Sequence, residues 1–136
     1  MFLIDCGQNM DPEHIKLAHD AVSGMIQQRI MQGGASNEVG IVCFGLPDED
    51  TSNTMNEQFP EEYLGIREVH LLQPANLDAL KHLDEVPELP RGETSDILDA
   101  LVIGSKIIWD RTQKLTWRRS VYLITNAAQR VRTTIL

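Results

Sequence analysis

The sequence has few of the features that place a protein outside the cell or in a membrane. It holds two cysteines among 136 residues, and no apolar run approaches the roughly 18 residues that a membrane-spanning helix needs. Its first residues lack the charged, apolar and small-residue sections of a secretory signal peptide. Cys6 and Cys43 both lie in apolar segments, which favours buried, reduced thiols over a disulfide. We therefore expect a soluble intracellular protein with reduced cysteines.

Motifs that would indicate an enzyme are also missing. The sequence contains neither G-x-x-x-x-G-K-[ST] nor G-x-G-x-x-G, the glycine-rich motifs that hold nucleotide phosphates. The segment VIGSK lacks the second glycine of a nucleophile elbow. The four histidines show no metal-binding spacing such as H-x-x-x-H. We expect no enzymatic activity and no cofactor.

Positive charge is scarce and gathers towards one end of the chain. The formal net charge is −8, which argues against binding of nucleic acid by the whole surface, because phosphate binding needs local positive potential. From Lys106 onward, seven basic residues and one acid give +6, whereas the preceding part carries −14. Arg118 and Arg119 in this basic stretch could contact nucleic acid, or they could complement the acidic body of the same molecule. We favour the interpretation in which these charges complement the acidic body or have no special role, because they flank a predicted strand and need not share a face.

Apolar segments alternate in a pattern typical of an α/β domain. The apolar run MFLIDC indicates a strand buried on both faces, and Asp11 with Pro12 marks the start of a helix that ends near Gly33. The helix expected at 95–110 is apolar on nearly all sides, which predicts burial, whereas the acidic segment 46–65 lacks periodicity and is expected to be a long loop. Further strands are expected at 38–45, 66–73 and 118–126, and a further helix at 76–86. This order predicts a single domain over residues 1–136, with a three-layer, Rossmann-like, mainly parallel open sheet.

Three polar loops should meet at one edge of this sheet. Ligands of open α/β sheets bind beyond the carboxyl ends of the strands, where the strand order reverses. The loops that follow FLID and YLIT should therefore be neighbours, with the loop RGETSD alongside them. Asp5, at the end of the first strand, is the candidate centre of any site there.

The motifs in these loops resemble those of the von Willebrand factor A family. In that family a strand runs into D-x-(S or G)-x, a loop with threonine precedes a buried helix, and a later strand ends in Thr plus Asp or Asn. The corresponding segments here are IDCGQNM, GETSDILDAL and YLITN. The segments LIDCGQNM, NEVGIVCFG, YLGIREVHLLQ and SDILDALVIGSKII are similar to the N-terminal domain of the larger subunit of the Ku DNA-end-binding heterodimer. The resemblance covers nearly the whole chain in the same order.

The resemblance implies a metal-ion site, which this sequence retains only in part. Asp5 matches the first carboxylate, and Thr94 (or Ser95) matches the threonine. Gly7 stands where metal-binding members have a serine, Asn9 stands at the second serine, and Asn126 replaces the final aspartate. Magnesium prefers carboxylate, hydroxyl and water oxygens in octahedral geometry. We therefore expect a degenerate site without a metal, in which Asp5 accepts hydrogen bonds from loop amides.

The resemblance to Ku implies a nuclear, non-catalytic protein-interaction module. Ku is a heterodimer that loads onto DNA ends in non-homologous end joining and contributes at telomeres. The ring that encircles DNA belongs to a central β-barrel domain that this chain does not contain. The implied partners are the smaller Ku subunit and repair or telomere factors that carry short basic motifs, with DNA bound by the full complex.

The acidic segment 46–65 is the candidate surface for such partners. Phe59 and Tyr63 alternate there with acids, among them Glu61 and Glu62. Aromatic anchors ringed by acids suit a basic peptide with an apolar residue. The other interpretation is that both rings hold the loop against the sheet edge and the acids are only solvated. The partner-binding interpretation predicts that Tyr63→Ala weakens capture of a basic peptide and leaves the melting temperature nearly unchanged.

One departure from the family concerns the end of the sheet. Family members continue past the strand corresponding to YLITN with further helices and strands, whereas only AAQRVRTTIL follows here. The sheet is therefore expected to be truncated after its fourth strand, as in a fragment, and its open edge to favour self-association. The alternatives are a metal-dependent adhesion-type A domain, nucleic-acid contact through the basic stretch, and a flavodoxin-like enzyme.

Overall fold

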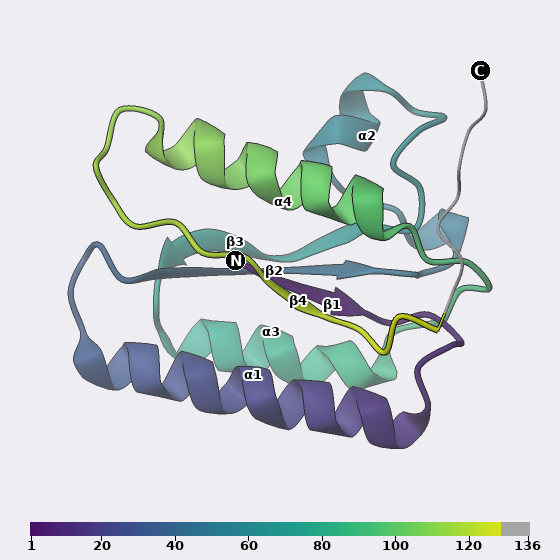
Figure 1. Ribbon diagram of the computed structural model, residues 1–136, viewed down its shortest axis with the longest axis horizontal. Helices are drawn as coiled ribbons and strands as arrows, with labels where there is room; N and C mark the ends of the chain where they lie inside the picture. The colour runs from purple at the N-terminus through teal and green to yellow at the C-terminus, as the bar shows by residue number, and fades with distance from the viewer. Residues whose placement is uncertain (129–136) are drawn as a thin grey trace.

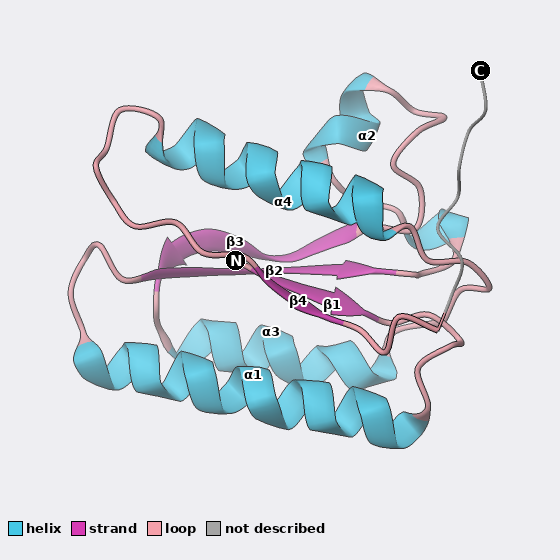
Figure 2. Ribbon diagram, in the orientation of Figure 1, coloured by secondary structure: helices cyan, strands magenta, loops and turns pink. Residues whose placement is uncertain are grey.

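The computed structural model describes residues 1–128 and shows a sheet between two layers of helices (Figure 1). Helices α1 and α3 cover one face of the sheet, and α4 with the short α2 lies on the other (Figure 2). The elements are β1 (Phe2–Asp5), α1 (Pro12–Gln32), β2 (Glu38–Phe44), η1 (Asp48–Asp50), α2 (Thr54–Gln58), β3 (Arg67–Pro74), α3 (Leu77–Glu85), η2 (Val86–Glu88), α4 (Ile97–Thr112) and β4 (Tyr122–Ile124). The predicted three-layer α/β architecture is confirmed.

The strands follow the order β3-β2-β1-β4. β1 pairs in parallel with both β2 and β4, and β3 pairs antiparallel with β2. Leu3 lies opposite Val42 on one side and Leu123 on the other. The sheet is thus mainly parallel, as predicted. The strand expected at 118–126 is shorter than predicted, since β4 spans three residues.

Helix α1 begins and ends where its sequence predicts. Asp11 precedes the helix in extended conformation, and Pro12 occupies its first turn, where a missing N–H costs nothing. Ile15, Ala18, Val22 and Ile26 are its buried residues, and their spacing puts them on one face of the helix. Gly33 closes the helix with φ +67, a left-handed conformation that glycine adopts freely.

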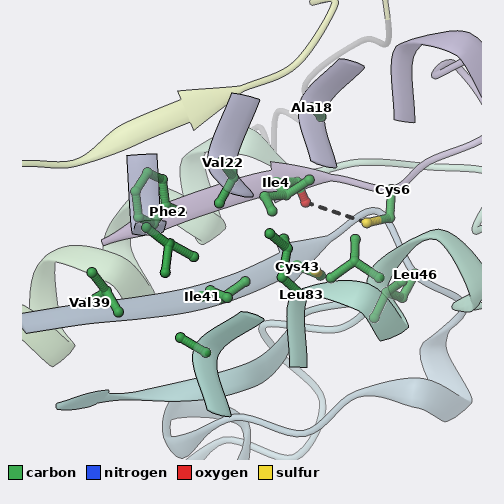
Figure 3. Packing of buried hydrophobic residues seen from close by; sticks show 13 residues of the cluster. Phe2, Ile4, Cys6, Ala18, Val22, Val39, Ile41, Cys43, Leu46 and Leu83 are labelled. Carbon is green, nitrogen blue, oxygen red and sulfur yellow. Dashed lines mark hydrogen bonds between the residues drawn. The ribbon is translucent and has the colours of Figure 1, made fainter. Parts of the chain in front are cut away.

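The larger apolar core lies between the sheet and the pair α1 and α3. Phe2, Ile4 and Ile41 pack there against Val22 and Leu83 (Figure 3). Cys6 and Cys43 are buried in the same core as free thiols. Its interaction with the Cys6 side chain, together with burial, raises the pKa of the Cys43 thiol. Cys43 is therefore not poised to react as a thiolate.

The opposite face of the sheet is covered by α4, but less completely than predicted. Ala100, Ile103 and Gly104 are buried against the sheet, and a Cβ on Gly104 would lie 2.9 Å from Leu3 Cδ2. The outer face of α4 is solvent-exposed at Leu98 (55%), Val102 (46%) and Trp109 (57%). The prediction of burial on all sides is wrong, because no further layer covers this helix within residues 1–128. No helix in that range is long and apolar enough to cross a membrane.

The acidic segment 46–65 is more ordered than a long loop. It contains the short helices η1 and α2, and Asn53 fastens it to the start of β3. The Asn53 side chain is buried, donates to the carbonyls of Tyr63 (3.0 Å) and Ile66 (2.9 Å), and accepts from the Asn56 amide. These side-chain contacts have no hydrophobic period, which explains why pattern analysis missed the fold of the segment.

Two histidines join α3 to β3. His70 on β3 is buried, and its Nδ1 lies 2.7 Å from Nδ1 of His82 on α3. One ring must donate and the other accept at this contact, so only one proton fits between them. The Nε2 of His70 is buried without a hydrogen-bond partner in the described part of the chain. The pair is therefore best accommodated with His70 neutral and donating through Nδ1–H.

We expect this pair to make the fold sensitive to acid. Burial and the neighbouring His82 lower the pKa of His70 from its ordinary value of 6.5, although Asp78 acts in the opposite direction. The unfolded chain then binds more protons than the folded chain below pH 6.5, so the His70 contribution to stability is lost as the pH falls through the lowered pKa. Urea unfolding at pH 7.5 and at pH 5.0 measures the loss of unfolding free energy on acidification. This loss should be smaller in the His70→Phe variant than in the parent chain.

His19 is the control for this prediction, because the fold shifts its pKa in the direction opposite to that of His70. Burial acts to lower the pKa of His19, but hydrogen bonds to Asp84 and Asp20 outweigh this and raise it. Its contribution is therefore present at low pH and lost as the pH rises through the raised pKa. His19→Gln should steepen the loss of stability on acidification, and a His70→Phe variant with the same acid sensitivity as the parent would refute the role of the pair.

Candidate functional site

A buried carboxylate lies where the polar loops meet beyond the carboxyl ends of β1 and β4. Asp5 is 1% exposed. Its Oδ1 accepts from the Gly7 amide (2.9 Å) and the Ser95 hydroxyl (2.8 Å). Its Oδ2 accepts from Asn9 Nδ2 (2.8 Å) and the Thr125 hydroxyl (2.7 Å). The predicted meeting of three loops is thus confirmed, and Asp5 is its centre.

Asn126 completes this polar cluster, defined as Asp5, Gly7, Asn9, Ser95, Thr125 and Asn126. Asn126 Oδ1 accepts from Asn9 Nδ2 at 2.9 Å, and its Nδ2 donates to the Asn9 carbonyl at 2.6 Å. The His14 ring on α1 lies 3.2 Å from the same Nδ2. The cluster therefore ties the end of β1 to α1, to the loop before α4 and to the end of β4.

Two glycines let the backbone pack closely around the polar cluster. Gly45 follows β2 with φ +78, and a Cβ there would collide with the Ser95 hydroxyl and lie 2.7 Å from the Gly7 nitrogen. A Cβ on Gly92 would lie 2.7 Å from the Gly45 carbonyl oxygen, and the Gly92 amide donates to that oxygen. This close approach is what brings Ser95 within reach of Asp5.

The donor set of the polar cluster is a poor match for a divalent cation. A carboxylate offers about four acceptor positions, and all four of Asp5 receive N–H or O–H donors of this chain. Mg²⁺ would need those oxygens and further oxygen ligands in octahedral geometry. Within residues 1–128, no group of three or more His, Cys, Asp or Glu side chains is arranged to hold a metal ion.

The four residues expected to bind a partner differ in exposure. Glu61 and Glu62 are exposed, and Phe59, which ends α2, is 47% exposed. Tyr63 is half-buried with φ +55 and packs against the apolar cluster beneath α4. The expectation of an unchanged melting temperature in Tyr63→Ala must therefore be corrected, because truncation removes part of this packing. Phe59 is the better probe of a surface role.

The basic residues near the end of the described chain are engaged within the molecule. Arg119 donates to the Thr112 hydroxyl (2.7 Å) and to the carbonyls of Thr112 and Leu115 (2.8 and 3.1 Å), which closes the end of α4. Arg111 pairs with Glu38 across 2.6 Å, and this hydrogen-bonded pair raises the arginine pKa. Arg118 and Arg119 are both exposed, so hydrogen bonds within the molecule engage the Arg119 guanidinium without removing it from solvent.

The chain is similar to two curated proteins, although no protein-family model matches it. It is 29% identical over 136 residues to ATP-dependent DNA helicase II subunit 2 of Neurospora crassa, a match that covers 93% of this chain and 18% of that protein. It is 23% identical over 127 residues to X-ray repair cross-complementing protein 5 of Dictyostelium discoideum, with coverage of 93% and 15%. The chain thus spans less than a fifth of the length of either relative.

The structure selects among the residues that the sequence proposed for the site. Asp5, Gly7, Asn9 and Asn126 all belong to the polar cluster. Of the two hydroxyls considered, Ser95 contacts Asp5, whereas Thr94 is exposed and lines a neighbouring cavity. Thr125 was part of the motif YLITN but was not proposed as a contact of Asp5. The contact could have been predicted from the position of Thr125 directly after a strand that runs parallel to β1.

Proposed function

We propose that this chain is a von Willebrand A-like, non-catalytic interaction module of a Ku-type DNA-end-binding protein. The observation that carries the proposal is the ordered set of motifs together with similarity to a protein named for X-ray repair over 93% of the chain. Such a module would act in the nucleus, in end joining and at telomeres. The smaller Ku subunit is its proposed partner, and DNA would be bound by the full complex.

Catalysis is not part of this proposal. One relative is named an ATP-dependent DNA helicase subunit, but the sequence of this chain contains no G-x-x-x-x-G-K-[ST] loop for a nucleotide. In the proposed function the polar cluster takes the position of the family's metal site, and its hydrogen bonds join the end of β1 to the end of β4. Asp5 then holds loops together instead of binding a cation.

Recruitment of partners is proposed for the surface around α2. Phe59 offers an exposed ring, and Glu61 and Glu62 beside it supply negative charge. The side-chain hydrogen bonds of Asn53 hold the segment in one conformation, so binding need not order a mobile loop. A short basic motif with a tryptophan could place its apolar ring against Phe59 and its cations beside the glutamates.

Titration of the chain with a labelled basic, tryptophan-containing peptide tests this proposal. Phe59→Ala should weaken binding at least about tenfold, as expected for an aromatic anchor, with little change in melting temperature because the ring is 47% exposed. Leu77→Ala is the matched control, since Leu77 is 68% exposed on α3, across the sheet. EDTA should leave the affinity unchanged. Equal affinity in the Phe59→Ala variant would remove this surface from the proposal.

Self-association is a further expectation for the chain studied alone. Leu123 lies in register with Leu3 and so projects to the α4 side of the sheet, where it is 39% exposed. Exposed Leu98, Val102 and Trp109 of α4 lie on the same side. Light scattering at increasing concentration should show dimers or larger species, which Leu123→Lys should reduce. A monodisperse monomer at all concentrations would show that this surface does not drive association.

A further inference from the structure

A cavity lies beside the first turns of α1 and the residue that follows β1. Its volume is about 290 Å³, roughly twice that of an engineered apolar cavity that binds benzene. Ile15 and Val86 are buried residues of its wall, Leu89 is partly buried, and Cys6 reaches it from the end of β1. Figure 3 shows Cys6 at one end of the core, near Ile4 and Leu46. The cavity is thus large enough for one apolar side chain.

The charges around this cavity are unlike those of the rest of the molecule. Lys16, His19 and Arg91 line it, and no Asp or Glu of the described residues does, although the chain carries a net charge of −8. His19 is held by Asp84 and Asp20 outside the wall. Lys16 and Arg91 form no salt bridge within residues 1–128. The two cations therefore lack a carboxylate counterpart in this part of the chain.

Arg91 has an unused hydrogen-bond donor. Its Nη2 donates to the Gly7 carbonyl at 3.0 Å, which fixes the guanidinium next to the cavity. Its Nε is buried and has no hydrogen-bond partner among the described residues. A buried donor without a partner is destabilising, and a guanidinium is geometrically suited to a carboxylate. The N-terminal turn of α1, with Pro12 in the cavity wall, adds a favourable field for an anion.

We propose that this cavity binds the C-terminal residue of a peptide, with an apolar side chain inside and the terminal carboxylate on Arg91 and Lys16. The apolar wall takes the side chain, and the cations take the carboxylate. The cavity volume suits one side chain better than a long acyl chain, which favours a peptide over a fatty acid. This site is separate from the α2 surface and does not depend on the function proposed for it.

Two tetrapeptides test the proposal with the 136-residue chain: acetyl-Gly-Ser-Gly-Leu with a free carboxylate, and the same peptide as its C-terminal amide. In an NMR titration the free acid should shift the amide signals of Ile15, Val86 and Leu89. It should bind at least about tenfold more tightly than the amide, as a charge-assisted contact implies. Equal binding of acid and amide, or no shifts around the cavity, would overturn the proposal.

Variants locate the carboxylate contact. Arg91→Gln and Lys16→Gln should each remove most of the preference for the free acid. Lys16 is exposed, so its variant should fold even if the Arg91 variant does not. Lys114→Gln makes the same charge change at an exposed position outside the cavity wall and should bind like the parent, as should Phe59→Ala. A preference for the free acid that persists in Lys16→Gln and in a folded Arg91→Gln would also refute the assignment.

A second ligand distinguishes a peptide from a lipid source of the same chemistry. Octanoate carries a carboxylate and an apolar chain but no peptide bond. The proposal expects octanoate to bind more weakly than the free-acid peptide at the same signals. Shifts of Ile15, Val86 and Leu89 with octanoate but not with the peptide would overturn the peptide assignment in favour of a fatty acid.

Discussion

Asp5→Ala should destabilise the domain by about 4 kcal/mol or more, which is a large part of the 5–15 kcal/mol that holds a typical domain folded. Four donors lose their hydrogen bond to Asp5: the Gly7 amide, Asn9 Nδ2 and the hydroxyls of Ser95 and Thr125. Asn9 Nδ2 keeps its bond to Asn126 Oδ1, whereas the bonds from Gly7 and Ser95 that are lost are fully buried. Each donor left buried without a partner costs about 1–3 kcal/mol, although the contributions are coupled and do not simply add. The corresponding fall in melting temperature is on the order of 10–20 °C.

The matched control for this variant is Glu85→Ala, at an exposed position near the end of α3, which should change the stability by no more than about 0.5 kcal/mol. Asp5→Asn should fall between the two, because the amide oxygen can accept two bonds while the amide nitrogen meets donors. Differential scanning calorimetry measures all three. A loss below about 1 kcal/mol in Asp5→Ala would show that the polar cluster does not stabilise the fold.

The same calorimetry tests the absence of a metal role. Because donors of the chain occupy the acceptor positions of Asp5, magnesium chloride and EDTA should leave the melting temperature of the parent chain unchanged. A cation present at 100 times its dissociation constant would instead stabilise the folded state by about 2.7 kcal/mol. A rise of several degrees with magnesium that Asp5→Ala abolishes would show that Asp5 takes part in a metal site.

Gly45→Ala is the second substitution with a large expected effect, a loss of about 3 kcal/mol. The φ of Gly45 is +78, and a left-handed conformation costs a residue with a Cβ about 1–2 kcal/mol. The new methyl group would also meet the Ser95 hydroxyl and the backbone of Gly7. It would therefore push apart two donors of Asp5. Equilibrium urea unfolding measures the loss.

Gly24→Ala provides the control, because at Gly24 an added Cβ meets neither backbone strain nor a steric clash. Gly24 lies inside α1, and a Cβ added there would meet nothing within 4 Å. Alanine is also preferred over glycine in a helix by up to about 1 kcal/mol, so this variant should be as stable as the parent or more stable. The double variant Asp5→Ala with Gly45→Ala should lose less than the sum of the single losses, because both disrupt the same contacts. Full additivity would mean that Gly45 acts independently of the polar cluster.

Much of this fold could be predicted from the sequence because its signals are local. Neighbouring residues alone are enough to predict three features: the apolar strand β1, the start of α1 at Asp11 and Pro12, and the end of α1 at a glycine. The meeting of Asp5 with the loop before α4 followed from the topology of an open parallel sheet. For these elements, propensity, pattern and topology agree.

What could not be predicted depends on contacts between distant residues or on side chains without a period. The choice of Ser95 over Thr94 depends on backbone packing at Gly45 and Gly92, which no spacing rule encodes. The fold of segment 46–65 depends on side-chain hydrogen bonds, among them those of the buried Asn53 and of Thr51. The prediction that α4 is buried on all sides was wrong. The apolar sequence of the helix shows that its outer face could be covered, but it does not show whether another element covers Leu98 and Trp109.

The position of β1 between β2 and β4 has a consequence for the order of folding. The Thr125 hydroxyl reaches Asp5 across 120 residues of sequence, and Ser95 does so across 90. Contacts so distant along the chain form late, because the entropy of closing the loop is lost before they form. During synthesis the edge of β1 that pairs with β4 therefore stays unpaired, and Asp5 accepts only from Gly7 and Asn9, until the loop before α4 and then β4 have been made.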